Sequence, residues 1–327
     1  MIITKTPLRM SFAGGGSDLR SFYKNFGGAV LSTSINKYIY VNINKKFDNG
    51  IRVGYSKNEE VSKIEDLEHP LVKASLKYLG IHEGLEITTI ADIPSKGTGL
   101  GSSSSFISGL LNGLHYYLKN PLSKKDLAEL SCHIEIDLCN EPIGKQDQYA
   151  AVFGGLNLIE FNEDDSVSVN SIKCSSDIIK KIEENIVVFY TGINRKSSSI
   201  LSQQSKDMDQ KNKQDIVKEM VKLCYELSSQ IQNNNISNFG EILHENWMLK
   251  KKINDNISNP KIDIWYQNAR LSGASGGKLL GAGAGGFLMF YADKENHKEI
   301  ISTLSDLEHI PINFEKSGTS IIYNDEM

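Results

Sequence analysis

The segment PSKGTGLGSSSSF (94–106) has the residue types of a loop that holds an anion. Three glycines alternate with other residues and run into Ser102–Ser105, just ahead of an apolar pattern of helical spacing. Glycines let backbone N–H groups converge on oxygen atoms, and the unpaired N–H groups of a first helical turn point to the same place. No lysine follows the last glycine, so the stretch is neither a P-loop nor a dinucleotide fingerprint. The residues alone leave two interpretations, a phosphate site and a helix entry without function.

Two other small-residue stretches lie next to predicted strands. Pro7–Asp18 (PLRMSFAGGGSD) places an arginine and an aspartate around a triple glycine. Gly281–Gly286 (GAGAGG) precedes the predicted strand FLMFYA, where close approach of two backbones requires small residues. Three such loops in one chain, each beside a strand, favour a common site over three unrelated turns.

In order and spacing, these stretches resemble the three signature motifs of the GHMP kinases, the superfamily of galactokinase, homoserine kinase, mevalonate kinase and phosphomevalonate kinase. PSKGTGLGSSSS resembles the ATP loop P-x-x-x-G-L-G-S-S of that family. The motif AGGGSD and the stretch GKQDQYAAVFGG (144–155) resemble the branch of sugar kinases that includes D-glycero-D-manno-heptose 7-phosphate kinases. The resemblance covers essentially the whole chain.

The resemblance implies an α+β fold of two domains. Residues 1–180 are expected to form an ATP-binding domain of the ribosomal protein S5 domain 2 type, and residues 181–327 a ferredoxin-like domain. It also implies an ATP- and Mg²⁺-dependent enzyme that phosphorylates an alcohol group of a small molecule. The positions that match the ATP loop are Lys96, Gly97, Gly99, Leu100, Gly101, Ser102, Ser103 and Ser104.

Two acidic residues match catalytic positions of the family. Glu135 matches the second Mg²⁺ ligand, beside Ser103; taken alone it reads as a solvated helix acid, and its place twelve residues before Asp147 favours the ligand. Asp147 matches the catalytic aspartate, which could accept the proton of the attacking hydroxyl; taken alone it reads as a helix N-cap. Arg9 matches the arginine beside that aspartate, although an arginine at a strand end is also an ordinary surface residue.

The resemblance implies that Gly15, Gly16, Ser17 and Asp18 build the substrate side. Asp18 matches a ligand of sugar hydroxyls, and a carboxylate can accept two hydrogen bonds from a vicinal diol. Gly15 and Gly16 match positions that are larger and polar in galactokinase, so open space for a bulkier sugar is expected there. The small residue Gly283 is also expected at the substrate. For a substrate phosphate the candidate cations are Arg20, Arg195 and Lys278, each of which is by itself more often a solvated surface group.

Small departures from the family pattern leave the sugar open: Ser17 stands in place of threonine, Ala284 in place of glycine and Asn194 where serine is common. The sequence therefore predicts a kinase for the anomeric hydroxyl of a sugar or sugar phosphate, with D-glycero-D-manno-heptose 7-phosphate preferred. The alternatives are a kinase for unphosphorylated fucose, galactose or mannose, and a non-catalytic sugar and ATP sensor.

Periodicity predicts the elements that position these loops. Alternating polar and apolar residues predict a strand at 38–44, followed by a hairpin turn at Asp48–Gly50 into 51–55. Apolar residues at helical spacing predict a helix over 102–119. The other predicted strands are 85–91, 156–161, 167–172, 186–190 and 286–291, and the other predicted helices are 70–80, 123–139, most of 196–272 and 294–306.

Length and composition set wider bounds. A chain of 327 residues favours two domains. A net charge of −4 argues against nucleic-acid or acidic-membrane partners, and Lys250–Lys252 reads as the solvated face of a helix. The four cysteines form no C-x-x-C pair, and no apolar run is long enough to span a bilayer. We therefore expect a cytoplasmic protein, monomeric or homodimeric.

Overall fold

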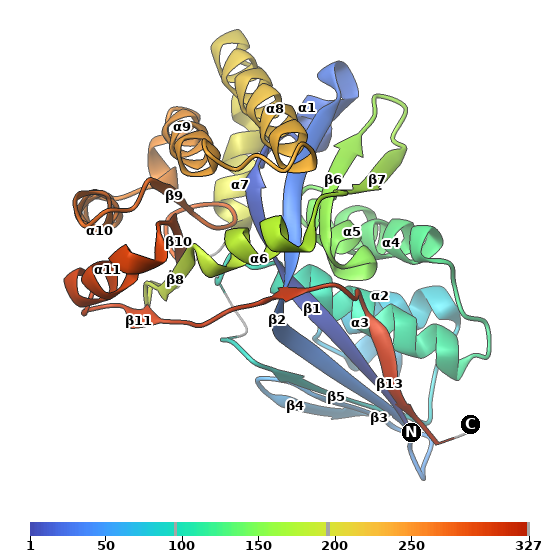
Figure 1. Cartoon of the computed structure of the whole chain (residues 1–327). Helices are drawn as coiled ribbons and strands as arrows, with labels where there is room; N and C mark the ends of the chain where they lie inside the picture. The colour runs from blue at the N-terminus through green and yellow to red at the C-terminus, as the bar shows by residue number, and fades with distance from the viewer. Residues whose placement is uncertain (95–96, 194–196, 326–327) are drawn as a thin grey trace.

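The computed structural model describes residues 1–94, 97–193 and 197–325. Its first sheet has the strand order β13-β1-β2-β5-β3-β4 (Figure 1). In addition, β6 and β12 pair with β2, and β7 pairs with β6. The strands are β1 (Ile2–Ala13), β2 (Gly28–Lys45), β3 (Ile51–Gly54), β4 (Asn58–Val61), β5 (Leu85–Ala91), β6 (Leu156–Phe161), β7 (Val167–Ser171), β12 (Phe314–Glu315) and β13 (Ser320–Asn324). The long antiparallel pair β1 and β2 forms the centre of this sheet.

Helix α3 (Ser102–Tyr117) packs on β1 and β2 and confirms the predicted helix after the glycine loop. Its apolar residues are buried at helical spacing, as in Ile107, Leu110 and Leu114. Gly109 brings the helix close to the sheet, since a Cβ atom there would lie 2.6 Å from Thr6 Oγ1. The other helices along this part of the chain are α1 (Arg20–Phe26), α2 (Pro70–Leu79), α4 (Lys124–Cys132), α5 (Gln146–Phe153) and α6 (Ser176–Glu184).

A second, antiparallel sheet has the order β11-β8-β10-β9. Its strands are β8 (Ile186–Tyr190), β9 (Gly276–Leu279), β10 (Phe287–Tyr291) and β11 (Glu308–His309). Its buried residues form an apolar core with those of the neighbouring helices, including Phe290 of β10, Trp247 and Trp265. The helices of this half are α7 (Ser197–Asp207), α8 (Lys211–Gln232), α9 (Phe239–Lys251), α10 (Pro260–Leu271) and α11 (His297–Thr303). Two sheets with separate helices confirm the expected α+β class.

The end of the chain returns to the first sheet. After β11, the strand β12 pairs with β2, and β13 pairs antiparallel with β1, close to both termini (Figure 1). A division of the chain near residue 180 remains a prediction, and these last strands lie in the sheet of the first half. No helix among the described residues combines the length and the apolar composition needed to cross a membrane.

The predicted hairpin at Asp48–Gly50 is wrong. Strand β5 lies between β2 and β3, and β3 pairs parallel with β5 and antiparallel with β4. The turn is present, because Gly50 N–H donates to Asp48 Oδ1 at 2.8 Å, but it connects two strands that are not neighbours. A turn motif reports a local reversal of the chain and carries no information about which strand is inserted later. The short helices α1, α5 and α6 and strand β9 were not predicted.

Candidate active site

An arginine–aspartate pair lies at the centre of the site. Arg9 lies in β1, opposite Ser34 of β2, and only 4% of its surface is exposed. Its Nε donates to Asp147 Oδ1 at 2.6 Å, and a terminal nitrogen donates to Asp147 Oδ2 at 2.7 Å. Asp147 lies in the first turn of α5 and keeps 20% of its side chain exposed. A two-pronged arginine–carboxylate pair is the geometry that fixes both groups most firmly.

The glycine loop lies against this pair. The other terminal nitrogen of Arg9 donates to Gly99 O at 2.7 Å, and Arg9 N–H donates to Leu100 O at 3.1 Å. Gly97, Gly99 and Gly101 have φ angles of 74°, 75° and 77°, a conformation that favours glycine. α3 begins at Ser102, directly after the loop, so its unpaired N–H groups lie at the same place. This arrangement of loop and helix start can bind a phosphate, with roughly half a positive charge from the helix dipole.

The small-residue stretch Gly281–Gly286 packs directly against the glycine loop. A Cβ atom on Gly281 would lie 2.4 Å from Gly99 Cα, and one on Gly286 would lie 2.3 Å from Thr98 O. The two backbones therefore touch, which explains why small residues are required in both. Gly283, expected at the substrate, instead faces Ile257, whose carbonyl oxygen would lie 2.7 Å from an added Cβ atom.

Glu135 is a buried acid in a π-helical turn, His133–Leu138, that follows α4. Its Oε2 accepts hydrogen bonds from Ser104 Oγ at 2.8 Å and from Gln148 Nε2 at 2.7 Å. Burial raises the pKa of Glu135 to about 7, against the lowering effect of hydrogen bonds from Ser103, Ser104 and Gln148. The alternative of a solvated helix acid is therefore wrong. Insertions of this π-helical kind are frequent at functional sites.

The residues around Glu135 fit a magnesium ion. Glu135 Oε1 is buried and has no hydrogen-bond partner among the described residues, and the exposed Ser103 lies beside it at the start of α3. Neither here nor in the rest of the described chain does a group of three or more His, Cys, Asp or Glu side chains form a metal site. Mg²⁺ commonly takes one or two protein carboxylates and completes its shell with substrate phosphates and water. Ser103 and Glu135 are the residues that would hold it.

The first small-residue stretch forms a loop that ends beside Asp147. Asp18 is buried; its Oδ1 accepts from Gly16 N–H at 2.9 Å and its Oδ2 from Gln146 Nε2 at 3.0 Å. Burial and the nearby Asp147 carboxylate raise the pKa of Asp18, while the two hydrogen bonds lower it. Asp18 therefore lies close enough to Asp147 to be affected by the charge of that carboxylate.

Comparison with known proteins identifies the family. The model of the GHMP kinases N terminal domain matches residues 69–155, and that of the GHMP kinases C terminal domain matches residues 227–307, together just over half of the chain. The chain belongs to the GHMP kinases. D-glycero-alpha-D-manno-heptose 7-phosphate kinase of Campylobacter jejuni is 29% identical over 315 residues, 93% of each chain. Galactokinase of Pyrococcus furiosus is 29% identical over 248 residues, 66% of this chain and 67% of the relative.

A solved structure shows the same GHMP kinase fold over its full length. The crystal structure of a D-glycero-D-manno-heptose 1-phosphate kinase from Bacteroides thetaiotaomicron has a TM-score of 0.81 and 26% identity. The alignment covers 99% of this chain and all of that one. The expected fold class, with the N- and C-terminal domains of the family, is confirmed.

The loop Gly14–Asp18, for which the sequence predicts sugar binding, is called the sugar loop below. In this GHMP kinase the space beside it differs from expectation at one glycine. Gly15 is open, since an added Cβ atom would meet only Ser11 Oγ, at 3.9 Å. Gly16 is covered, because an added Cβ atom would lie 2.3 Å from Nε2 of Gln204 in α7. The expected open space therefore exists at Gly15 and not at Gly16. Ser17 is buried, and its Oγ donates to Gly14 O and Ala29 O, so it holds the loop itself.

The residues predicted to bind a substrate phosphate differ in how accessible they are. Lys278 is only 1% exposed, and its Nζ donates to Phe12 O at 3.1 Å, which places it inside the molecule and away from a surface phosphate. Burial lowers the pKa of Lys278 well below its usual range, and Lys250 and Arg9 lower it further. Lys250 is also buried and donates to Gly281 O, so the interpretation of Lys250–Lys252 as a wholly solvated face is wrong. Lys96 and Arg195 lie outside the described residues.

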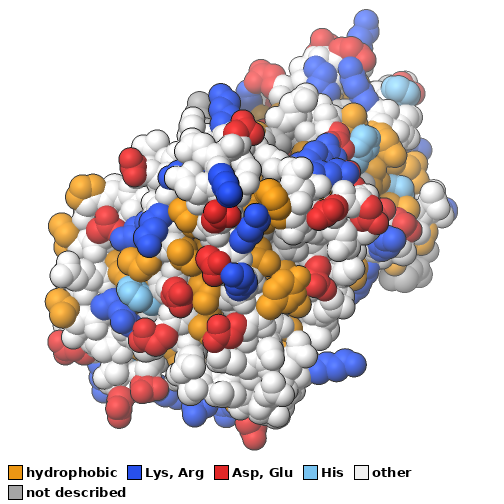
Figure 2. All heavy atoms as spheres, turned by 90° about the horizontal axis from the view of Figure 1, so that it is seen from above, with side chains coloured by type: hydrophobic (Ala, Val, Ile, Leu, Met, Phe, Trp, Pro, Cys, Tyr) orange, Lys and Arg blue, Asp and Glu red, His pale blue; other side chains and the backbone are white. Residues whose placement is uncertain are grey.

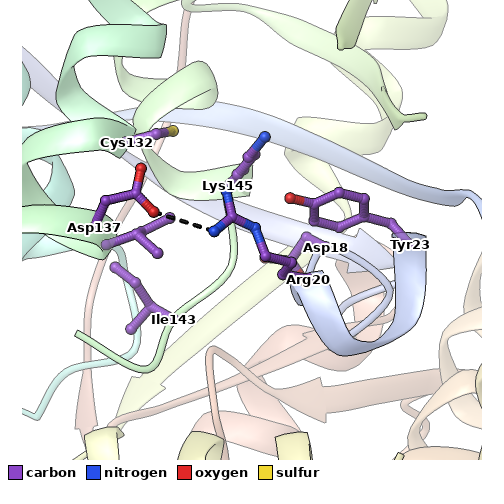
Figure 3. A pocket seen from close by; sticks show the side chains of 8 residues that line it. Asp18, Arg20, Tyr23, Cys132, Asp137, Ile143 and Lys145 are labelled. Atoms are coloured by element: carbon purple, nitrogen blue, oxygen red, sulfur yellow. Dashed lines mark hydrogen bonds and ion pairs between the residues drawn. The ribbon is translucent and has the colours of Figure 1, made fainter. Parts of the chain in front are cut away.

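Arg20 borders a small pocket beside the sugar loop (Figure 3). Its guanidinium points toward Asp137 and donates to Oδ1 at 3.2 Å, while 55% of its side chain remains exposed. Lys145 lies next to it and donates to Asp165 O and Oδ1. The pocket is lined by Asp18, Arg20, Tyr23, Cys132, Ile136, Asp137, Ile143 and Lys145.

Sequence reasoning missed several polar residues of the site. Gln146 and Gln148 flank Asp147 and bind Asp18 and Glu135, and Gln204 and Asn246 reach the sugar loop from α7 and α9. The first two stand in the quoted stretch GKQDQ, where their alternation with Asp147 could have indicated a shared role. No signal in the sequence separates the other two from ordinary helical amides.

Proposed function

We propose that this GHMP kinase transfers the γ-phosphoryl group of ATP to the anomeric hydroxyl of D-glycero-D-manno-heptose 7-phosphate, giving the 1,7-bisphosphate. The observation that carries the proposal is Arg9, which binds both oxygens of Asp147 and, with its remaining terminal nitrogen, the carbonyl of Gly99 in the phosphate loop. One side chain thereby connects the group that would receive the proton to the loop that would hold the donor. The names of the relatives supply the sugar.

In the proposed step, the sugar oxygen forms a bond to the γ-phosphorus, the bond from that phosphorus to the β-phosphate bridging oxygen breaks, and ADP leaves. The hydroxyl proton passes to a carboxylate oxygen of Asp147, which Arg9 holds in place by a hydrogen bond to each oxygen. Since transition states of phosphoryl transfer are loose, positioning and charge stabilisation contribute more than the base does. The N–H groups at the start of α3 and the Arg9 guanidinium supply that stabilisation.

Magnesium, held by Ser103 and Glu135, would neutralise charge on the phosphates. Glu135 is prepared for this role by Ser104 and Gln148, which fix one of its oxygens and leave the other without a partner among the described residues. Asp18 would accept hydrogen bonds from sugar hydroxyls next to Asp147. These assignments explain why the site contains a buried acid on the phosphate side, Glu135, and another on the sugar side, Asp18.

A kinase for an unphosphorylated sugar is the second candidate, and the cations near the sugar loop favour it. Arg20 is paired with Asp137, Lys145 is paired with Asp165, and Lys278 is buried against Phe12 O. A substrate phosphate would have to compete with these partners. The relation to galactokinase and to the bifunctional fucokinase/GDP-fucose pyrophosphorylase of Arabidopsis thaliana agrees with this candidate.

Release of ADP, measured over a panel of sugars, tests the proposal. The panel contains heptose 7-phosphate, heptose 1-phosphate, free heptose, galactose, fucose and mannose, and ³¹P NMR of each product identifies the oxygen that is phosphorylated. We expect the highest kcat/KM for heptose 7-phosphate, with the new phosphate at C1. Higher kcat/KM for a free sugar would establish the second candidate. Binding of ATP without turnover of any sugar would indicate a sensor instead.

We also propose that the enzyme acts in the cytoplasm, as a monomer or homodimer, on small molecules. Support for the compartment comes from the thiols, since all four cysteines are free in the described structure and reduced thiols are usual in the cytosol. On the face shown in Figure 2, acidic and basic side chains are interspersed. A nucleic-acid site would need clustered cations.

A further inference from the structure

A buried amide lies directly on the sugar loop. Gln204 of α7 is 1% exposed, and a Cβ atom on Gly16 would lie 2.3 Å from its Nε2. Among the described residues this Nε2 has no hydrogen-bond partner. A buried donor without a partner costs roughly 1–3 kcal/mol, so its presence next to a binding loop needs an explanation.

The position of Gln204 is fixed by hydrogen bonds of two residues that follow it in α7. Ser205 Oγ donates to Ser21 Oγ of α1 at 3.0 Å. Asp207 accepts from Asn254 Nδ2 at 2.8 Å. α7 therefore lies beside α1, near the end of β1 from which the sugar loop leaves (Figure 1). The helix presents Gln204 to Gly16 as part of the packed structure.

The chemistry of a sugar explains what this donor could serve. A hydroxyl group both donates and accepts. The acidic side chains at this site, Asp18 of the loop and Asp147 of α5, offer acceptors. Both Asp18 oxygens already accept hydrogen bonds, from Gly16 N–H and from Gln146. The oxygen of a sugar hydroxyl at this loop needs a hydrogen-bond donor, and the N–H groups of Gln204 Nε2 have no acceptor among the described residues.

We propose that Gln204 Nε2 donates a hydrogen bond to a hydroxyl of the sugar held at the Gly15–Asp18 loop, which makes Gln204 a residue that determines sugar specificity. This inference rests on the proposed function, since it assigns the sugar to that loop. Asn246 of α9, also buried, positions the loop, since its Oδ1 accepts from Gly14 N–H at 3.2 Å. Its Nδ2, like Gln204 Nε2, has no partner among the described residues.

The test replaces the amide and measures the two substrates separately. Gln204→Met keeps the length of the side chain and removes the donor. Gln210→Met makes the same change at an exposed glutamine just before α8, whose side chain makes no capping hydrogen bond. We expect Gln204→Met to raise KM for the sugar about tenfold, which corresponds to about 1.4 kcal/mol. In this variant KM for ATP should stay within about twofold of wild type, and the thermal midpoint within about 2 °C. For Gln210→Met the same limits should hold, and KM for the sugar should also stay within about twofold.

Substrate analogues that each lack one hydroxyl give a readout that a structural role would not change. If Gln204 binds a hydroxyl, one deoxy analogue should weaken binding in the wild type and have no further effect in Gln204→Met or in the shorter Gln204→Asn. Equal losses in wild type and variants for every analogue would overturn the inference. The measurements use the sugar that the wild type phosphorylates best. A preference for a free sugar would therefore refute only the proposed substrate. Unchanged KM values for the sugar in the Gln204 variants would refute only the role of Gln204.

Discussion

At the scale of single residues, the pairing of Arg9 with Asp147 makes the clearest prediction. Asp147→Asn removes the proton acceptor and keeps the shape, so kcat should fall about 100-fold, within the usual range for a general base. KM for ATP should change little, because the phosphate loop binds Arg9 and α3 and does not depend on the charge of Asp147. Steady-state kinetics with saturating sugar measure both quantities.

Asp215→Asn is the matched control for that change, since Asp215 is an exposed acid of α8 with a distant ion pair to Lys218 at 3.7 Å. Its kcat should equal that of the wild type. If Asp147→Asn also kept the wild-type kcat, another group would have to receive the proton, and the assigned role would be lost.

Lys278 makes a prediction about pH. Burial lowers the pKa of its amine below the ordinary 10.5, so between the two values the unfolded chain binds more protons than the folded one. Stability then rises with pH through this window, by the linkage between proton binding and unfolding. Lys278→Met removes this contribution. The free energy of unfolding of the wild type, relative to Lys278→Met, should therefore increase from pH 7 to pH 10, as measured in urea.

Lys252→Met provides the comparison, because Lys252 is an exposed residue at the end of α9. Its difference from the wild type should be constant over the same pH range. A constant difference for Lys278→Met as well would mean that the amine keeps its ordinary pKa despite its burial.

The residues of the site were predictable to different degrees. Arg9, Asp147 and Glu135 could be named because a family pattern fixes their spacing, although their roles remain to be tested. The burial of Lys278 and Lys250 could not be foreseen, since a lysine in a short strand or a helical charge run is usually solvated. Gln204 reaches Gly16 from a helix nearly 190 residues away along the chain, a contact that only tertiary packing creates.

At the scale of elements, the site depends on the contact between two glycine loops. Gly281 has a φ angle of 73°, and its missing Cβ atom would lie 2.4 Å from Gly99 Cα. Because both partners are backbone, neither can turn away. Gly281→Ala should displace the phosphate loop and raise KM for ATP at least about tenfold, a change that ATP titration in the kinetic assay would detect.

Gly80→Ala is the control that distinguishes the effect of the contact between the loops from the effect of backbone strain alone. Gly80 ends α2 with a φ angle of 66°, and no atom lies within 4 Å of an added Cβ. Gly80→Ala should cost about 1 kcal/mol of stability, from the left-handed conformation alone, and leave KM for ATP unchanged. Equal effects of the two substitutions on KM would show that the contact between the loops does not hold the phosphate site.

The elements themselves were predictable where one periodic pattern extends over several turns. α3 follows from apolar residues at helical spacing, and its buried face meets β1 and β2 as such a pattern requires. The order of strands was not predictable, because β5 enters between β2 and β3 from later in the chain. α1 and α5, with seven and eight residues, are too short for a periodic signal.

At the scale of the whole molecule, the C-terminal segment connects the two elements that carry Arg9 and Asp147. Thr319 Oγ1 bonds Thr6 Oγ1 of β1 at 2.8 Å, and Thr319 N–H donates to Ala151 O of α5 at 2.8 Å. β1 carries Arg9 and α5 carries Asp147. Strand β13 also covers the edge of β1 that the first sheet would otherwise expose. The end of the chain thus stabilises a site from which it is distant in sequence.

Removal of residues 312–327 tests this arrangement. The truncated enzyme loses β12, β13 and the bond from Tyr38 to Glu315, so its free energy of unfolding should fall by at least about 3 kcal/mol. Because Arg9 and Asp147 lose a shared support, kcat should fall more than KM for ATP rises. Removal of residues 325–327 alone takes away the exposed ion pair of Met1 and Asp325, which contributes at most about 1 kcal/mol, and should preserve kcat. If the enzyme without residues 312–327 kept the wild-type kcat and stability, β1 and α5 would hold Arg9 and Asp147 without the C-terminal strands.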